Sequence, residues 1–519
     1  MTARRQFESL YPAKSPYVDR FEAIAELTVP SLFRSRHQGA FDPLAEPYQS
    51  EGAQGVMGLA AKFLLTILPP SGHFARLEVP RFALQEALLK QGVDGADVNK
   101  IKTETEESLN VVMQEAHAFL DTAPGLRPTA FEYFQHQIAG GNGVFEIQDE
   151  VIDGRPELRF THHNLHDYVV ERDRAGNANL LIIREVLSRA NAPERALFLF
   201  MEKQDEVEMF TKMQRVDKKN WDVVQEINDV EIPGTTGKFT PKTNPFIIGR
   251  FIPIAREAYG RGWCEHLFGD LRSLEGVSEA LVDGAAAAAR LIPFLDPNSG
   301  VSAKRINDAR NGEVLTGRAD ALSFANVGKQ ADFQFALQLE DRLTRRLARA
   351  FLRTSSVQRD GERVTAAEFT LMARELESSF GGVYSTVAEE FQRPLMNRVL
   401  AIMQKHRMIP KLPDDLVRVG IVTGLGSLGR GRDLDDLSTG IASVSQLLGP
   451  QAVGQFIETR EAAARILNAV GVDTRGFLKS QEQVQAEQQK ALQAQTAQDT
   501  APELVRQGGQ MIREQNAPQ

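Results

Sequence analysis

The chain has 519 residues, of which 42% are hydrophobic and 25% are charged, so it is long enough for several domains and has the composition of a soluble, globular protein. Its 60 basic and 69 acidic residues give a net charge of −9, whereas a tight binder of duplex DNA carries a basic surface that neutralises phosphates. Tight DNA binding is therefore disfavoured, but a conduit along which DNA slides is not, because a conduit should attract the duplex only weakly.

Neither a disulfide framework nor a membrane-spanning segment is expected. The single cysteine, Cys264, fits a reducing cytosol and is expected to be a buried, inert thiol. The N-terminus lacks the apolar core of a signal peptide. The two most apolar stretches, 56–68 and 284–295, contain Lys62 and Arg290 and are shorter than the roughly 20 residues that a spanning helix needs.

The first part of the chain predicts helices followed by a sheet. Residues 1–140 are mainly helical in pattern, most clearly at 101–120, where apolar residues recur at helical spacing. From 145 to 251, short β-rich runs alternate with turn signals such as Asp153-Gly154 and Gly176. This texture predicts an antiparallel sheet region.

Two helices that flank a small polar insert are predicted next. The helices cover 267–295 and 331–353, and the insert at 298–329 has strand candidates at 313–315 and 322–324. A helix of 24 residues is about 36 Å long. A pair of that length, with a small domain at its tip, cannot bury all its sides alone, so neighbouring copies could supply the missing cover.

A longer helical pattern and a polar tail complete the chain. A break at 358–363 precedes a pattern at 366–406 whose apolar positions step by three or four residues, with bends expected at Gly381-Gly382 and Pro394. A strand at 417–422 and helices at 434–448 and 451–470 follow. From Gln481 the chain is rich in Gln and Ala and is expected to be disordered or marginally helical.

One glycine motif imitates a cofactor loop. Gly424, Gly426 and Gly429 match G-x-G-x-x-G after a strand-like run and before a helix, which is the arrangement of a dinucleotide-binding loop. However, the helices that follow meet without a second parallel strand, and no acidic residue is placed to bind a ribose. A glycine-rich turn is favoured, and a dinucleotide-binding oxidoreductase remains the alternative.

Other candidate motifs favour structural interpretations. Gly234 to Lys238 lacks the spacing of a phosphate loop and indicates a hairpin turn. His162, His163 and His166 could offer two metal ligands, but no cysteine or further histidine joins them, so a surface loop is favoured. No paired carboxylates, nucleophile elbow or HExxH sequence appears, so the protein is not expected to be an enzyme or to need a cofactor.

The second helix of the pair carries a basic stripe. The arginines share one face, about 120° from the apolar face of that helix. They are Arg342, Arg345, Arg346, Arg349 and Arg353. A solvated face, or ion pairs with a neighbouring helix, is the favoured interpretation, and a surface near DNA is the alternative.

Several collinear stretches between about residue 16 and residue 475 carry a resemblance. They are TVPSLF from Thr28, GAQGVMGLAAKFLLTILP from Gly52, YGRG from Tyr259, GDLRSLE from Gly269, TGR from Thr316, KQADF from Lys329, VQRDGERVTA from Val357, ELE from Glu375, GGVYS from Gly381, TGL from Thr423 and GRGRDL from Gly429. Together they resemble the portal (head-to-tail connector) family of short-tailed, autographivirus-like bacteriophages.

This resemblance implies an α+β, mainly helical portal fold assembled as a cyclic ring, usually of twelve subunits, at one capsid vertex. The implied parts are a wing at 1–266, a first stem helix at 267–297, a clip at 298–329, a second stem helix at 330–357, a channel loop with a long wing helix at 358–440 and a crown at 441–480. The resemblance does not cover the Gln-rich tail at 481–519, which is expected to be flexible from its composition.

The resemblance also implies partners, a location and a DNA-facing loop. Double-stranded DNA would be packaged and ejected through the channel of a virion protein that is assembled in the host cytoplasm. The implied partners are the major capsid and scaffolding proteins, the terminase large subunit, the tail adaptor protein and internal core proteins. The loop that would approach DNA contains Gln358, Arg359, Asp360, Gly361, Glu362 and Arg363.

Overall fold

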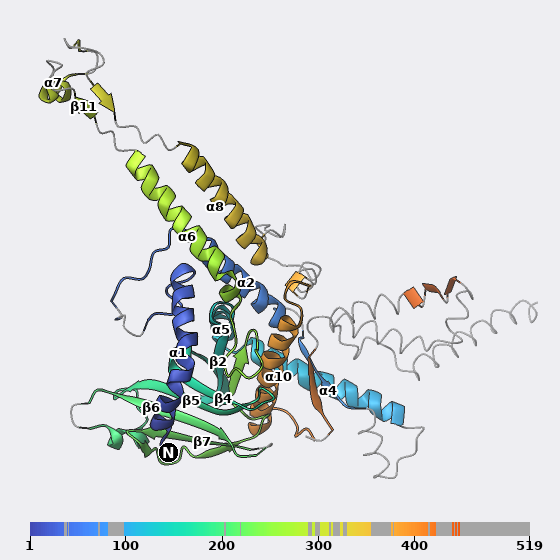
Figure 1. The fold of residues 1–519 in the computed structure, drawn as a ribbon. Helices are drawn as coiled ribbons and strands as arrows, with labels where there is room; N and C mark the ends of the chain where they lie inside the picture. Colours follow the sequence, from blue (N-terminus) through green and yellow to red (C-terminus); the bar gives the residue numbers. More distant parts are fainter. Residues whose placement is uncertain are drawn as a thin grey trace, which may run out of the picture. The chain divides into compact units, whose positions relative to one another are not determined.

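The computed structural model divides the chain into two units, Met1–Gly424 and Leu425–Gln519. The structure describes residues 1–35, 39, 41–70, 73–80, 98–201, 204–217, 220–288, 293–295, 302–310, 313–314, 322–324, 330–353, 375–376, 378–413 and 416–421 of the first unit. Of the second unit it describes short helical pieces at 439–440, 442–443 and 445–446. The fold below is therefore that of the first unit (Figure 1).

Helices occur at the start of the chain, between its strands and after its larger sheets. They are α1 (Ala3–Leu27), α2 (Glu51–Ile67), α4 (Val98–Asp121), α5 (Leu126–Gly140), α6 (Trp263–Ala288), α7 (Ala303–Asp308), α8 (Gln330–Ala350) and α10 (Gly382–Lys405), with 3-10 turns η1 (Leu165–Asp167) and η2 (Glu194–Leu199). The helices expected in residues 1–140 are thus present, and α4 contains the whole segment predicted from periodicity.

The strands form antiparallel sheets. They are β1 (Ala75–Glu78), β2 (Asn142–Ile152), β3 (Arg155–His163), β4 (Tyr168–Arg172), β5 (Ala178–Ser188), β6 (Glu206–Arg215), β7 (Trp221–Ile227), β8 (Val230–Glu231), β9 (Gly237–Phe239), β10 (Phe246–Arg250), β11 (Pro293–Leu295), β12 (Leu322–Phe324) and β13 (Arg418–Ile421). One sheet has the order β10-β2-β3, and a larger one has the order β4-β5-β6-β7-β8, with β9 also on β7.

The expected sheet region between 145 and 251 is confirmed, together with its turns. Asp153 and Gly154 join β2 to β3 with φ angles of +50° and +77°, and Gly176 adopts a φ of +87° between β4 and β5. The turn at Gly234 has a φ of +76°, but it is not a hairpin turn, because β8 and β9 on either side of it both pair with β7.

Helix α5 lies at the centre of the largest hydrophobic core. Its Phe134 ring lies 6.3 Å from Phe63 of α2 and 5.3 Å from Phe391 of α10, while Tyr133 lies 5.8 Å from Phe145 of β2. These side chains are buried. Burial of large aromatic groups gives the dominant favourable term in folding, so this cluster fixes three helices against the smaller sheet.

A buried lysine attaches α1 to the larger sheet. The ammonium of Lys14 donates hydrogen bonds to the carbonyl oxygens of Leu165, His166 and Tyr168 at 2.8, 3.1 and 2.8 Å. It also lies 4.5 Å from the centre of the Tyr11 ring. Three carbonyl acceptors and an aromatic face compensate for the loss of water around a charge that is fully buried.

The structure corrects two expectations at the tip of the helix pair. Helix α6 ends at Ala288, and Pro293–Leu295 forms β11, whereas a helix was expected as far as Leu295. Pro293 explains part of this difference, since a proline inside a helix removes a hydrogen bond and collides with the preceding turn. Strand β12 is confirmed, but Glu313 and Val314 lie in no strand, and β12 pairs with β11 instead.

Elsewhere the later elements agree with the sequence. The bend expected at Gly381 is confirmed by a φ of +53° at the start of α10, where the chain leaves the helical conformation. The apolar positions predicted along α10 from Val387 onward, including Phe391 and Leu395, are buried, and Val383 is partly buried. Strand β13 falls within the predicted 417–422.

Cys264 is buried, which raises the pKa of its thiol and agrees with an inert role. Within the residues that the structure describes, no helix combines the length and apolar character that crossing a bilayer requires.

The contact of α4 with the segment around β1 buries a histidine. His117 donates one hydrogen bond, from its Nδ1 to the carbonyl oxygen of Met113 at 2.8 Å, and its ring lies 4.9 Å from Phe74. Burial lowers the pKa of His117 from 6.5 to about 4, with a smaller contribution from the nearby His73. The folded protein therefore holds this imidazole neutral at pH values where the unfolded chain already binds a proton.

This difference predicts a pH-dependent stability. Because the folded pKa is depressed, the contribution of neutral His117 is fully present above about pH 6.5 and is lost as the pH falls toward 4, by about 3 kcal/mol in all. The variant His117→Gln should flatten the curve of unfolding free energy against pH in this window, as measured by urea titration of both proteins at several pH values. Parallel curves for wild type and variant would contradict the assignment.

Candidate functional site

Helices α6 and α8 form an antiparallel arm that leads to β11, α7 and β12 (Figure 1). Trp263 Nε1 donates to the carbonyl oxygen of Ala350 at 3.1 Å, and Ser278 Oγ donates to Glu340 at 3.1 Å. Farther along, the Phe333 ring lies directly on Gly284, where an added Cβ would come within 2.4 Å of the ring. The absence of a side chain at Gly284 thus lets the two helices approach closely.

Burial along the arm decreases from its base to its tip. Near the base, Leu271 and Leu274 of α6 and Leu343 and Leu347 of α8 are buried. Beyond Ser278 on α6 and before Leu343 on α8, none of the side chains that the structure describes is buried. Two antiparallel helices can cover only one stripe of each other, so the outer sides of the arm have no cover among the described residues.

An exposed apolar surface follows from this geometry. Phe335 is 69% exposed, Leu337 is 53% exposed and Val282 is 52% exposed, all on the half of the arm that the body of the chain does not cover. Phe294 in β11 and Val314 in the insert are exposed as well. We call Val282, Phe335 and Leu337 the arm patch. Phe335 and Leu337 are two positions apart on α8, so they face different sides of that helix. Both sides of the arm therefore expose apolar groups, and exposed apolar surface of this kind marks an interaction surface.

The basic stripe of α8 is divided between internal ion pairs and open solvent. Arg346 pairs with Asp270 of α6, and Arg353 pairs with Glu51 of α2, as the favoured interpretation of the sequence predicted. Arg345 pairs with Asp341 one turn earlier in its own helix at 2.9 Å. Arg342 and Arg349 are exposed and, among the described residues, have no carboxylate partner.

The expected channel loop and the glycine motif lie outside the described residues. This applies to 358–363 and to 424–429. The strand before the glycine motif, β13, is described, and it pairs antiparallel with β1. A dinucleotide loop requires a parallel strand–helix–strand unit, so the described part of this region gives the cofactor-binding alternative no support.

The histidines expected in a surface loop are buried instead. His163 Nε2 lies 2.8 Å from a Glu146 carboxylate oxygen, and His166 stacks on Phe33 with 4.1 Å between ring centres. The expectation was wrong because it ignored two distant elements: Phe33, after α1, covers His166, and Tyr133 and His136 of α5 pack against His162. The alternation of exposed Thr161 with inward His162 is typical of a strand and could have indicated the burial.

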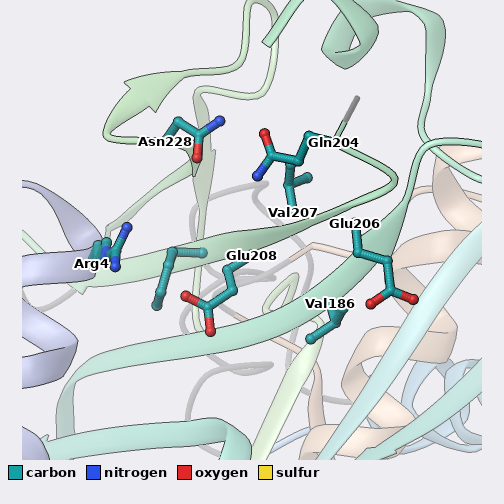
Figure 2. Close-up of a pocket in the computed structure, with 8 residues that line it drawn as sticks. Arg4, Val186, Gln204, Glu206, Val207, Glu208 and Asn228 are labelled. Atoms are coloured by element: carbon teal, nitrogen blue, oxygen red, sulfur yellow. The ribbon is translucent and has the colours of Figure 1, made fainter. Parts of the chain in front are cut away.

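A shallow cavity of about 280 Å³ lies against β6 (Figure 2). It is lined by Arg4, Val186, Gln204, Glu206, Val207, Glu208, Phe210 and Asn228. The carboxylate of Glu208 pairs with Arg184 at 3.4 Å, so one of the two acidic residues that line the cavity already has a partner. Since sites for drug-sized ligands usually occupy about 300–1,000 Å³ and enclose their ligand, no ligand is assigned to this open and largely polar surface.

Comparisons with known proteins give one consistent result. A family model described as "Bacteriophage head to tail connecting protein" matches residues 1–478. The portal protein of Enterobacteria phage T3 is 32% identical over 492 residues, which cover 93% of this chain and 89% of that protein. The portal protein of Escherichia phage T7 is 31% identical with the same coverage. That of Enterobacteria phage SP6 is 26% identical and covers 94% of this chain and 92% of its own length.

Proposed function

The chain belongs to the family of bacteriophage head-to-tail connecting proteins, and from this membership we propose that it forms a closed ring at one capsid vertex through which DNA enters and leaves the head. Members of this family are structural connectors of the virion. The resemblance noted in the sequence implies twelve subunits. In this proposal the protein has no catalytic role and acts through the contacts that its surfaces make with neighbouring subunits, partner proteins and DNA.

The arm patch is the observation that carries the ring proposal. A chain that leaves Phe335, Leu337 and Val282 in water gains free energy when a neighbour covers them, at about 25 cal/mol per Å² of apolar surface removed from water. Contacts between one side of an arm and the opposite side of the next are head-to-tail, and such contacts close into rings when the rotation between neighbours allows it.

The described elements fit the parts of a portal subunit. We assign α6 and α8 to the stem and the β11–α7–β12 insert to the clip. We assign α1, α2, α4, α5 and α10, with the remaining sheets, to the wing. The crown at 441–480 and the tail at 481–519 complete the proposal. The clip contributes little to the core, so its proposed role is contact, first with the terminase large subunit and then with the tail adaptor protein.

The remaining surfaces are proposed to meet the head and its contents. The wing would contact the major capsid and scaffolding proteins, and internal core proteins would lie on the capsid side of the ring. Double-stranded DNA would pass through a channel whose lining includes the loop 358–363. Because the net charge is −9, attraction for DNA would be confined to local basic groups such as Arg342 and Arg349 of the stem.

The ring proposal predicts the effect of a charge in the arm patch. Phe335→Asp should leave the unfolding free energy within about 0.5 kcal/mol of wild type, because this side chain is 69% exposed in the single chain. In the ring the new carboxylate would lose its water against an apolar neighbour. The variant should therefore remain monomeric at concentrations where wild type forms rings, as observed by mass photometry and electron microscopy.

The matched control is Ser9→Asp, which introduces the same charge at an exposed polar position of α1, outside the arm. It should assemble like wild type. Rings of unchanged size from Phe335→Asp, or a wild-type chain that stays monomeric across the accessible concentration range, would contradict the proposal.

The channel loop predicts a defect that is separate from assembly. Arg359→Ala combined with Arg363→Ala should leave ring formation intact and lower the amount of DNA packaged or retained, because each subunit would lose two positive charges beside the duplex. The measurement is the DNA content of particles that carry the variant. Particles that package normally, or rings that fail to form, would each show that these arginines do not face DNA.

A further inference from the structure

A carboxylate and two imidazoles meet where α5 packs on β3. Glu132 and His136 are one helical turn apart on α5, so their side chains lie on the same face of that helix. His162 projects toward them from β3, with its Nδ1 at 3.6 Å from a carboxylate oxygen of Glu132. One ligand atom from each of the three residues lies within 4.8 Å of the other two.

The two imidazoles are buried, and each has an unpartnered nitrogen. His136 is 1% exposed and the His162 side chain is 2% exposed, with 4.3 Å between their ring centres. Nδ1 of His136 and Nε2 of His162 have no hydrogen-bond partner. Buried polar atoms are almost always hydrogen-bonded, so the unpartnered Nδ1 of His136 points to a missing partner that accepts a nitrogen lone pair. The His162 nitrogen beside Glu132 is Nδ1, so Nδ1, rather than the unpartnered Nε2, is the ligand atom that His162 offers there.

The protonation states suit a metal ion. Burial lowers the pKa of His136 and of His162, so both rings are neutral near pH 7 and offer lone pairs. The neighbouring His162 lowers the pKa of Glu132, so its carboxylate is ionised. Metal ligands must be deprotonated to bind. Two neutral nitrogens and one anionic oxygen form a donor set that suits zinc better than magnesium or calcium, which prefer oxygen alone.

We propose that Glu132, His136 and His162 bind one Zn²⁺ ion that connects α5 to β3, with the fourth position taken by water. Tetrahedral ligands at Zn–N distances of about 2.0–2.1 Å lie about 3.3 Å apart, so the three groups must close by about 1 Å or more. Glu132 can make most of this movement, because its side chain is 55% exposed and can change rotamer freely. The same exposure opens a path by which the ion enters.

The other histidines of this region are occupied elsewhere. Nε2 of His163 lies against Glu146 at 2.8 Å, and Nε2 of His166 lies against the carbonyl oxygen of Arg34 at 2.9 Å. The third ligand is instead His136, which precedes His162 by a strand and a turn. The site lies in the body of the subunit, so this proposal is independent of ring formation and of DNA passage.

The test uses the full chain after treatment with a chelator and removal of the chelator. Titration with ZnCl₂ should bind one ion per chain, measured by elemental analysis after gel filtration, and should raise the thermal unfolding midpoint, since binding to the folded state stabilises it. MgCl₂ at the same concentrations should not. Glu132→Gln and His162→Gln should each weaken zinc binding by at least about tenfold, and His266→Gln, at an exposed histidine of α6, should not.

The results for these variants either support or overturn the zinc site. Loss of zinc binding in Glu132→Gln with an unchanged midpoint in the metal-free state supports the site, and this variant remains informative if His162→Gln fails to fold, because Glu132 is exposed. Equal zinc affinity in wild type, Glu132→Gln and His266→Gln would overturn the proposal, as would the absence of zinc binding at about tenfold molar excess.

Discussion

The limited cover that two antiparallel helices give each other is the constraint on which this structure depends. At the base of the arm, the body of the chain supplies what the pair lacks: Phe351 lies on Gly55 of α2, and Lys62 of α2 donates to the carbonyl oxygen of Leu352 at 2.6 Å. Toward the tip that support ends, and apolar side chains such as Phe335 stay in water. The same helices are therefore anchored at one end and incomplete at the other, which is the form expected of an element that neighbours must cover.

The part of the chain that contacts the base of the arm is itself tightly packed. Helix α5 is packed by α2, α10 and the β10-β2-β3 sheet through a continuous set of aromatic rings, of which Phe134, Phe63 and Phe391 are members. Lys14 then connects α1 to the larger sheet through three carbonyl oxygens. A metal ion at Glu132, His136 and His162 would add a further connection between α5 and β3.

Long periodic elements could be predicted from the sequence, and contacts between distant segments could not. The spacing of apolar residues gave α4, α10 and the helices of the arm, because a helix face is a local property of the chain. Strand β11 was missed because three residues carry no periodic signal and its partner β12 lies some thirty residues later. The burial of these histidines was missed because it depends on side chains from other elements: His166 stacks on Phe33, and His162 packs against Tyr133 and His136 of α5. The shared face of the basic stripe could be predicted from helical spacing, whereas the pairing of Arg346 with Asp270 depends on how α8 is aligned against α6.

The most direct test of the central claim is the accessibility of the arm patch before and after assembly. The only natural cysteine, Cys264, is buried, so Leu337→Cys provides a single reactive thiol, and Ser9→Cys on α1 provides an exposed reference. The rate of maleimide labelling at position 337 should fall by about tenfold or more between dissociated subunits and rings, because a neighbouring arm covers it, while the reference rate stays the same. Equal labelling rates at position 337 in both states would show that neighbours do not cover the arm.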